Sequence, residues 1–169
     1  MTGHPEGHVS FASTHGAELF SVRQVPRLNG TPGVETLAQV MWPDHCVQGS
    51  HGSELEDGLQ KLLERETTKA KTKYVHKGSD PSLDSYSAFA DNEYSKFTDM
   101  GRILYEGAVK EVHVIGLATD YCVRATAIDA RKFGFSTVVH ADGVRAVDGG
   151  RQEMVLDEMR GWGCQVVVN

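Results

Sequence analysis

The sequence lacks several features that would place it in a specialised class of protein. Its three cysteines, Cys46, Cys122 and Cys164, are widely spaced and form no Cys-x-x-Cys pair. An odd number of scattered thiols argues against a disulfide scaffold, so we expect reduced cysteines in a reducing compartment. No apolar run approaches membrane-spanning length and no signal peptide opens the chain. These absences predict a cytoplasmic protein, or one shared between the cytoplasm and the nucleus.

Positive charge is also scarce. The chain has 17 lysine and arginine residues against 23 aspartate and glutamate residues, with no basic block. This balance argues against a nucleic-acid or membrane surface and leaves small molecules, other proteins or a homo-oligomer as the expected partners. With 169 residues, 40% of them hydrophobic, the chain can bury a sizeable core. We therefore expect one domain over residues 1–169.

From residue 71 onward, the apolar pattern alternates between strand and helix. Strands are expected at 74–77, 112–117, 136–141 and 165–168, and helices at 97–109, 120–133 and 151–162. This alternation is typical of a parallel α/β sheet with helices on both faces, in which 112–117 is buried. Leucines at helical spacing predict an earlier helix over 53–65 with a core-facing stripe. The first fifty residues are rich in His, Gly, Pro and Ser and read as loops.

Cys122 lies where an apolar strand turns into an amphipathic helix. Unpaired backbone N–H groups and the positive end of the helix dipole stabilise a thiolate at a helix N-terminus, which is a favourable place for a nucleophile. A lone cysteine is most often a buried packing residue, however. Its position alone leaves both interpretations open.

Histidines and one lysine are the other candidates for chemistry. His4, His8 and His45 lie in the loop-rich first fifty residues, and neutral imidazole is a common ligand of zinc and iron. Histidines at this spacing are more often solvent-exposed than metal-bound, and the other five show no pattern above a surface or packing role. Lys77 ends an expected strand, where it could stabilise negative charge in a crevice or simply be solvated.

Four segments together resemble one family. WPDHCVQGS, KGSDPSLDSYSAF and GLATDYCVRATA follow one another as in the nicotinamidases (pyrazinamidases) of the isochorismatase-like cysteine hydrolases, and HPEGHVSFAS resembles the metal loop of that family. The resemblance covers nearly the whole chain from His4 onward. It implies a three-layer α/β fold with a mostly parallel sheet in the strand order 3-2-1-4-5-6. It also implies hydrolysis of nicotinamide to nicotinate and ammonia in NAD salvage.

The resemblance further implies roles for individual residues. Cys122 matches the nucleophile, which forms a thioester with the substrate, and Lys77 matches the catalytic lysine. The amides of Ala118 and Cys122 match the oxyanion hole, beside a cis peptide expected between Leu117 and Ala118. The implied substrate pocket contains aromatic rings suited to stacking on a pyridine, namely Trp42, Tyr86, Tyr121 and Phe11. A divalent metal ion of the zinc or iron type is implied to bind His4, His45 and, as in some relatives, His8.

Two expected parts of the family pattern are missing. The first strand of the family carries an aspartate that acts as the general base, and no such segment occurs in this sequence. The aspartate of the metal motif is replaced by Thr2, a poor substitute for an anionic ligand, and neither Asp44 nor Asp120 matches the base. We therefore expect an N-terminally truncated member of the fold. An inactive relative that acts by binding or oligomerising, and a related amide or isochorismatase-type hydrolase, are the alternatives.

Overall fold

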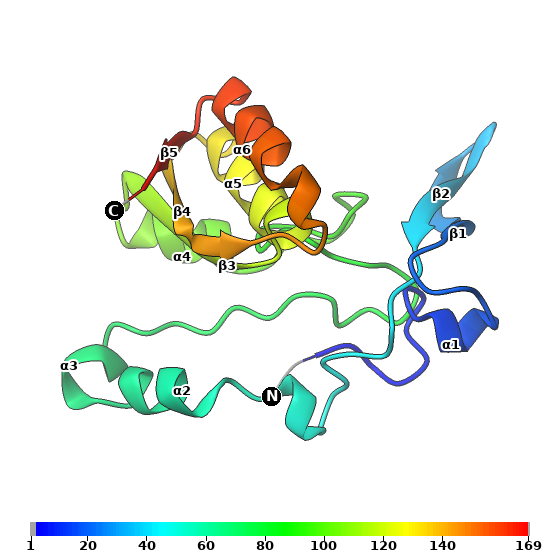
Figure 1. The fold of residues 1–169 in the computed structure, drawn as a ribbon, viewed down its shortest axis with the longest axis horizontal. Helices are drawn as coiled ribbons and strands as arrows, with labels where there is room; N and C mark the ends of the chain where they lie inside the picture. The colour runs from blue at the N-terminus through cyan, green and yellow to red at the C-terminus, as the bar shows by residue number, and fades with distance from the viewer. Residues whose placement is uncertain (1–2, 169) are drawn as a thin grey trace. The chain divides into compact units, whose positions relative to one another are not determined.

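The computed structural model describes residues 3–168, apart from the side chains of residues 28–31. The chain separates into two compact units, Met1–Asp84 and Ser85–Asn169, which we call the first and the second unit. Figure 1 labels the helices and strands of both. The single domain expected over residues 1–169 stays a prediction. Every helix within residues 3–168 is too short or too polar to serve as a membrane span.

The first unit contains a hairpin and several short helices. Strands β1 (Val22–Thr31) and β2 (Val34–Val40) pair antiparallel. The helices are α1 (Ala12–His15), η1 (His51–Ser53), α2 (Asp57–Leu63) and α3 (Glu66–Lys69). The prediction that the first fifty residues are loops is wrong over the hairpin. The sequence does not predict these two strands because few apolar residues alternate with the polar ones. Most side chains of β2 are exposed.

A small apolar cluster forms the core around this hairpin. Ala12 of α1, Val25 of β1 and Met41 after β2 are buried together. Hydrogen bonds at the end of β2 support the cluster, since Met41 N–H donates to the carbonyl of Ser21 at 2.9 Å and Trp42 N–H donates to that of Ser10 at 2.7 Å. The chain before α1 is thereby held against the end of the hairpin.

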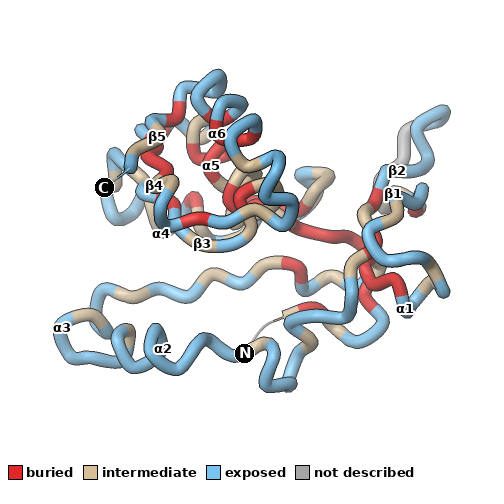
Figure 2. Tube along the Cα trace, viewed as in Figure 1, coloured by how far each residue is buried: buried red, intermediate tan, exposed pale blue. Residues whose placement is uncertain are grey.

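The leucine-rich segment forms a shorter helix than the predicted 53–65. Helix α2 begins after Glu56, whose carboxylate accepts the N–H of Leu59. Leu55, Leu59 and Leu62 are 39%, 44% and 43% exposed, so the expected core-facing stripe is wrong. Helical spacing identifies an apolar face but not what covers it. Figure 2 shows the largely exposed surface of α2.

The strand predicted at 74–77 is also absent. Residues 73–80 have no assigned secondary structure and follow a long extended path in Figure 1. A strand needs a neighbour to accept and donate its backbone hydrogen bonds, and no strand of the described chain pairs with this segment. The segment therefore has an extended path without ladder pairing.

The second unit contains the predicted alternation of strands and helices. Strands β3 (Glu111–Leu117), β4 (Ser136–Arg145) and β5 (Gln165–Val167) form a parallel sheet in the order β3-β4-β5. The helices are α4 (Met100–Glu106), the π-helix η2 (Thr119–Val123), α5 (Arg124–Lys132), η3 (Gly149–Arg151) and α6 (Gln152–Gly161). The parallel α/β architecture is confirmed, although α4 is shorter than the predicted 97–109.

Helices α5 and α6 cover one face of this sheet (Figure 1). Buried residues of both helices pack there against Val114 of β3 and Val139 of β4. On β3 only Val114 is buried, while Ile115 and Leu117 are 68% and 73% exposed. The prediction that 112–117 is a buried strand is therefore wrong for one of its faces. An apolar run does not reveal that a strand will lie at the edge of the described sheet with one face open.

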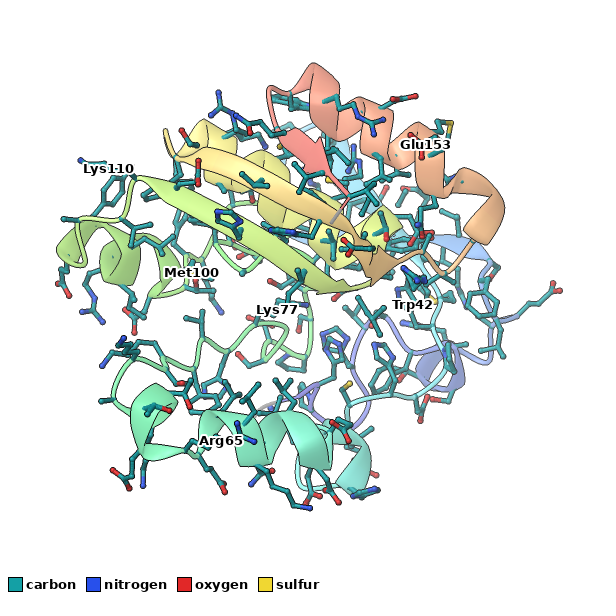
Figure 3. The ribbon with its side chains drawn as sticks, turned by 60° about the vertical axis from the view of Figure 1, so that its left-hand side comes forward. Trp42, Arg65, Lys77, Met100, Lys110 and Glu153 are labelled. Atoms are coloured by element: carbon teal, nitrogen blue, oxygen red, sulfur yellow. The ribbon has the colours of Figure 1, made fainter. Side chains whose placement is uncertain are left out.

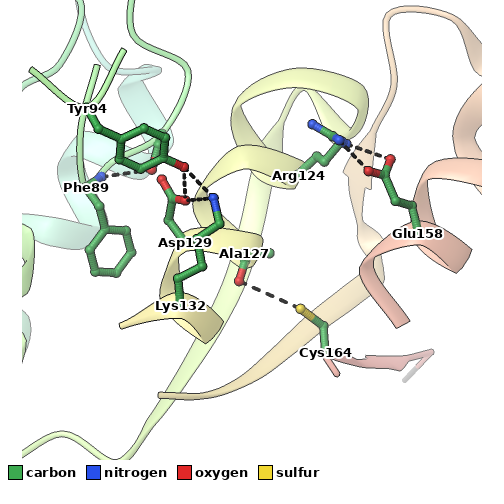
Figure 4. A network of polar contacts seen from close by, with 9 residues as sticks. Phe89, Tyr94, Arg124, Ala127, Asp129, Lys132, Glu158 and Cys164 are labelled. Atoms are coloured by element: carbon green, nitrogen blue, oxygen red, sulfur yellow. Dashed lines mark hydrogen bonds and ion pairs between the residues drawn. The ribbon is translucent and has the colours of Figure 1, made fainter. Parts of the chain in front are cut away.

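Polar contacts anchor α5 within the second unit (Figure 4). Buried Asp129 of α5 accepts hydrogen bonds from Tyr94 Oη at 2.6 Å and Lys132 Nζ at 3.0 Å. Arg124 of α5 pairs with Glu158 of α6 through two hydrogen bonds, with 2.7 Å between Nε and Oε2. These contacts fix α5, the helix that follows Cys122, against its neighbours.

Candidate functional site

The first unit brings two histidines and an aspartate together in its interior. Ligand atoms of His4, His8 and Asp84 all lie within 4.8 Å of one another, and all three residues are buried. Backbone hydrogen bonds bring these distant segments together. His4 N–H donates to the carbonyl of Cys46 at 2.9 Å, and Val9 N–H donates to that of Pro81 at 2.8 Å.

His4 is held in the state that a metal ligand requires. Its Nδ1 lies 2.9 Å from the carbonyl oxygen of Gly78, which can only accept, so Nδ1 carries the proton and Nε2 keeps its lone pair. Burial, reinforced by the nearby His8, lowers the pKa of His4 from 6.5 to about 4. His4 is therefore neutral near pH 7, and its lone pair is available to a cation.

His8 carries a buried nitrogen for which the described residues offer no hydrogen-bond partner. This atom is Nε2, while Nδ1 lies 2.8 Å from Ser10 Oγ and accepts the backbone N–H of Ser10 at 3.2 Å. Burial lowers the pKa of His8, and the charge of Asp84 opposes that shift. An unsatisfied buried polar atom costs about 1–3 kcal/mol. A bound cation would offset this cost in the tautomer in which Nδ1 donates to Ser10 Oγ and Nε2 has the lone pair. Two imidazoles and a carboxylate are also a ligand set typical of zinc, so the residues present fit a metal ion.

Sequence reasoning missed Asp84. The family pattern places the carboxylate ligand two residues before His4, at the position of Thr2, which lies outside the described residues. Asp84 occurs within the motif KGSDPSLDSYSAF, and its place in this motif is the only feature of the sequence that could have indicated a role for it. Its carboxylate accepts a hydrogen bond from buried Gln39 at 2.9 Å, which orients it within the cluster.

The other predicted residues of the first unit surround this cluster. His45 is exposed, lies outside the converging set, and has its ring centroid 5.0 Å from that of His4. Phe11 is buried with its ring 5.6 Å from that of His4, and the ring of Trp42 lies 6.3 Å from that of His45. Lys77 is half-buried on the extended segment 73–80, directly before Gly78 (Figure 3). The structure thus groups the predicted histidines with two of the four predicted aromatic residues.

In the second unit, Cys122 lies in a tight turn between strand and helix. The expected cis peptide joins Leu117 to Ala118 at the end of β3. The carbonyl of Ala118 then accepts the N–H groups of Tyr121 at 3.1 Å and Val123 at 3.0 Å. Cys122 is half-buried within η2, two residues before α5 begins, so the predicted strand–turn–helix setting is present with a π-helical turn at its centre.

Two further contacts shape this turn. The rings of Tyr86 and Tyr121 meet edge to face with centroids 5.4 Å apart, and burial raises the pKa of Tyr121. The carboxylate of Asp120 accepts the N–H groups of Val147 at 3.0 Å and Asp148 at 3.1 Å. Asp120 therefore ties the loop after β4 to the turn that carries Cys122.

Comparison with known proteins places these features in a family. The isochorismatase domain matches residues 8–168. The nicotinamidase of Escherichia coli (strain K12) is 42% identical over 146 residues, covering 86% of this chain and 61% of that protein. The nicotinamidase of Acinetobacter baylyi is 35% identical over 164 residues, covering 96% of this chain and 69% of that protein. The chain thus spans less than two thirds of the length of the Escherichia coli relative.

Solved structures agree with this placement. The yeast nicotinamidase bound to the inhibitor nicotinaldehyde superimposes with a TM-score of 0.90 at 32% identity, covering 99% of this chain and 77% of that chain. The pyrazinamidase of Pyrococcus horikoshii in complex with zinc has a TM-score of 0.68 at 30% identity, covering 99% of this chain and 72% of that chain. The chain belongs to the isochorismatase family, and nicotinamidases are among its relatives.

Proposed function

We propose that the chain is a nicotinamidase, a hydrolase that converts nicotinamide and water to nicotinate and ammonia in NAD salvage. The observation that carries the proposal is the turn after β3, which places Cys122 between the cis peptide at Ala118 and the start of α5. Two facts about relatives support it. Relatives at 42% and 35% identity are named nicotinamidases. Solved neighbours contain nicotinaldehyde or nicotinate, which favours a small pyridine substrate.

In the proposed reaction, Cys122 Sγ attacks the carboxamide carbon of nicotinamide. The thiol proton is transferred to the leaving nitrogen, the C–N bond breaks, and ammonia departs from a thioester. The amides of Ala118 and Cys122 stabilise the oxyanion, and the ammonium group of Lys77 supplies positive charge. Water then adds to the thioester, which releases nicotinate and restores the thiol.

We further propose that His4, His8 and Asp84 hold a divalent cation of the zinc or iron type, with His45 as an additional ligand. When bound, the cation supplies a Lewis acid for the pyridine nitrogen of the substrate. The buried Nε2 of His8 and the neutral state of His4 support this assignment. Phe11, Trp42, Tyr86 and Tyr121 are the proposed aromatic contacts of the ring, where stacking would orient it.

A second candidate function is binding of a pyridine ligand without catalysis. It is favoured by a specific observation, namely that Asp120 uses both carboxylate oxygens to accept backbone N–H groups. A carboxylate engaged in this way is poorly placed to take the thiol proton. Among the described residues, Asp84 is likewise committed to the histidine cluster.

The direct test is ammonia release from nicotinamide by the purified chain with added zinc or iron. We expect Cys122→Ala to abolish release, whereas Cys46→Ala, which removes an exposed thiol, should stay within twofold of the wild type. Pyrazinamide and an isochorismate-type substrate, assayed in parallel, distinguish a nicotinamidase from a related hydrolase. No release by folded wild-type protein that still binds nicotinamide would favour the second candidate.

A further inference from the structure

A second group of titratable side chains lies on the sheet of the second unit. His113 of β3 and His140 of β4 place Nδ1 and Nε2 2.8 Å apart, with the rings stacked at a centroid distance of 5.1 Å. Glu111 Oε1 lies 2.9 Å from His113 Nε2. The proposed reaction uses none of these three residues.

The strand register explains why the two imidazoles meet. Side chains alternate along a strand, so Glu111 and His113 lie on the face opposite Val114, which packs against α5 and α6. His113 is paired with Val138 of the neighbouring parallel strand, and His140 is two residues further along on the same face. These side chains therefore converge on the sheet face opposite the one that α5 and α6 cover.

The hydrogen bonds around His113 prepare one of its nitrogens as a ligand. A carboxylate can only accept, so His113 Nε2 carries the proton that Glu111 binds. In neutral His113 the lone pair is then on Nδ1, which accepts a hydrogen bond from His140 Nε2 at 2.8 Å, so a metal ion can bind both nitrogens only once His140 moves its proton to its own Nδ1. A carboxylate–histidine pair of this kind fixes the tautomer and the orientation of the ring, as in the outer shell of many zinc sites.

We propose that His113 Nδ1 and His140 Nε2 are the ligands of a second site for a divalent transition-metal ion such as Zn²⁺, with Glu111 as the positioning residue behind His113. Two nitrogens about 2.0–2.1 Å from a tetrahedral zinc ion lie roughly 3.3 Å apart, so the pair must open by about half an ångström. The side chains of His113 and Glu111 are 53% and 50% exposed, which leaves room for this movement and for water to complete the coordination. This inference does not depend on the proposed function.

The test is a Zn²⁺ titration of the whole chain against a chromophoric chelator. The double variant His113→Gln/His140→Gln should bind one ion fewer than the wild type. Glu111→Gln keeps both ligands but loses the charge behind His113, so we expect its affinity at this site to fall about tenfold. His51→Gln is the matched control, because the side chain of His51 is 94% exposed and also contacts a glutamate, Glu54.

A second measurement needs no variant. In the wild type, Zn²⁺ should shift the ring ¹⁵N resonances of His113 Nδ1 and His140 Nε2 while His51 stays unchanged. The expected difference of one bound ion between wild type and double variant does not depend on how many ions the His4, His8 and Asp84 cluster holds. The test of this second site can therefore fail while the proposed function stands, and the reverse. Unchanged stoichiometry in the folded double variant, or unshifted resonances of both rings, would overturn the site.

Discussion

Gly78 determines how closely the extended segment can approach His4. It has a φ of +66°, and a Cβ atom there would lie 2.6 Å from His4 Cε1 and 3.0 Å from Nδ1. A methyl group would therefore push the ring away from the carbonyl that orients it, in addition to straining the backbone. We expect Gly78→Ala to weaken Zn²⁺ binding at the His4 cluster at least tenfold, measured by competition with a chelator.

Gly7 provides the control for Gly78. Its φ of +70° is nearly the same, but a Cβ atom there meets nothing within 4 Å. Gly7→Ala thus reports backbone strain without the collision. Equal affinities of the two variants would show that contact with His4 plays no part.

Some residues of the candidate site could be predicted from the sequence, and others could not because their roles depend on contacts between distant segments. His4, His8 and Cys122 could be singled out because their residue types suit the chemistry and the motifs that contain them resemble those of the nicotinamidases. Asp84 could not, because its role depends on the hydrogen bond from Val9 to Pro81, which brings its segment to the histidine loop. Contacts between segments far apart in the sequence leave no local pattern to read.

Among the elements, β3 offers a matched pair of side chains on opposite faces. Val114 is 7% exposed and packs beneath α5 and α6, whereas its neighbour Ile115 is 68% exposed. We expect Val114→Ala to lower the free energy of unfolding by about 2 kcal/mol, because it removes two buried methyl groups. Ile115→Thr should change it by less than about 0.5 kcal/mol. Urea denaturation of both variants checks this, and a large loss for Ile115→Thr would contradict the open face.

The ion pair between Arg124 of α5 and Glu158 of α6 should make the free energy of unfolding depend on pH. Hydrogen bonds from Arg124 lower the pKa of Glu158 below its usual 4.5. The ion pair therefore contributes its full stabilisation above pH 4.5. This stabilisation is lost as the pH falls through the lower pKa that Glu158 has in the folded state. Because the side chains are 38% and 41% exposed, solvent limits the effect to below about 1 kcal/mol.

We expect Glu158→Gln to be less stable than the wild type at pH 7 and to approach it at about pH 3, measured by urea denaturation across this range. The single variant Arg124→Gln and the double variant Arg124→Gln/Glu158→Gln complete the cycle that isolates the pair. A difference between Glu158→Gln and wild type that stays constant with pH would contradict the assigned cause.

How well the elements could be predicted depended on their apolar pattern. The succession from β3 to β5 was predictable because each strand has a continuous apolar run and each helix an amphipathic period. The hairpin β1–β2 was not, since its apolar residues form neither a regular alternation nor a continuous run. The strand at 74–77 was predicted but has no partner in the described chain. Burial was the least predictable property, as Leu59 and Ile115 illustrate, because sequence does not reveal what covers an apolar face.

For the whole molecule, the two tryptophans allow a test of domain organisation. Trp42 belongs to the first unit and Trp162 to the second, and the chain has no other. We propose one cooperative domain, because the family match spans residues 8–168 across both units. Fluorescence of Trp42→Phe and Trp162→Phe in urea should then give the same midpoint, shifted in each case to the same extent by Zn²⁺. Two separate midpoints would indicate two domains whichever of them Zn²⁺ moves, since the second unit carries the proposed His113–His140 site.

The hairpin of the first unit is expected to open on a shorter timescale than the sheet of the second unit. An isolated two-stranded ribbon is marginally stable, and β1–β2 is attached to its unit mainly through Val25, Leu37 and Met41. Such elements open by local fluctuation long before global unfolding, so its amides should exchange with deuterium well ahead of those in β4. Trp42 follows β2 almost directly. Because Trp42 joins the end of the ribbon to Ser10 and Ala12 through backbone hydrogen bonds, we expect each opening of the ribbon to loosen the packing of this indole beside His45.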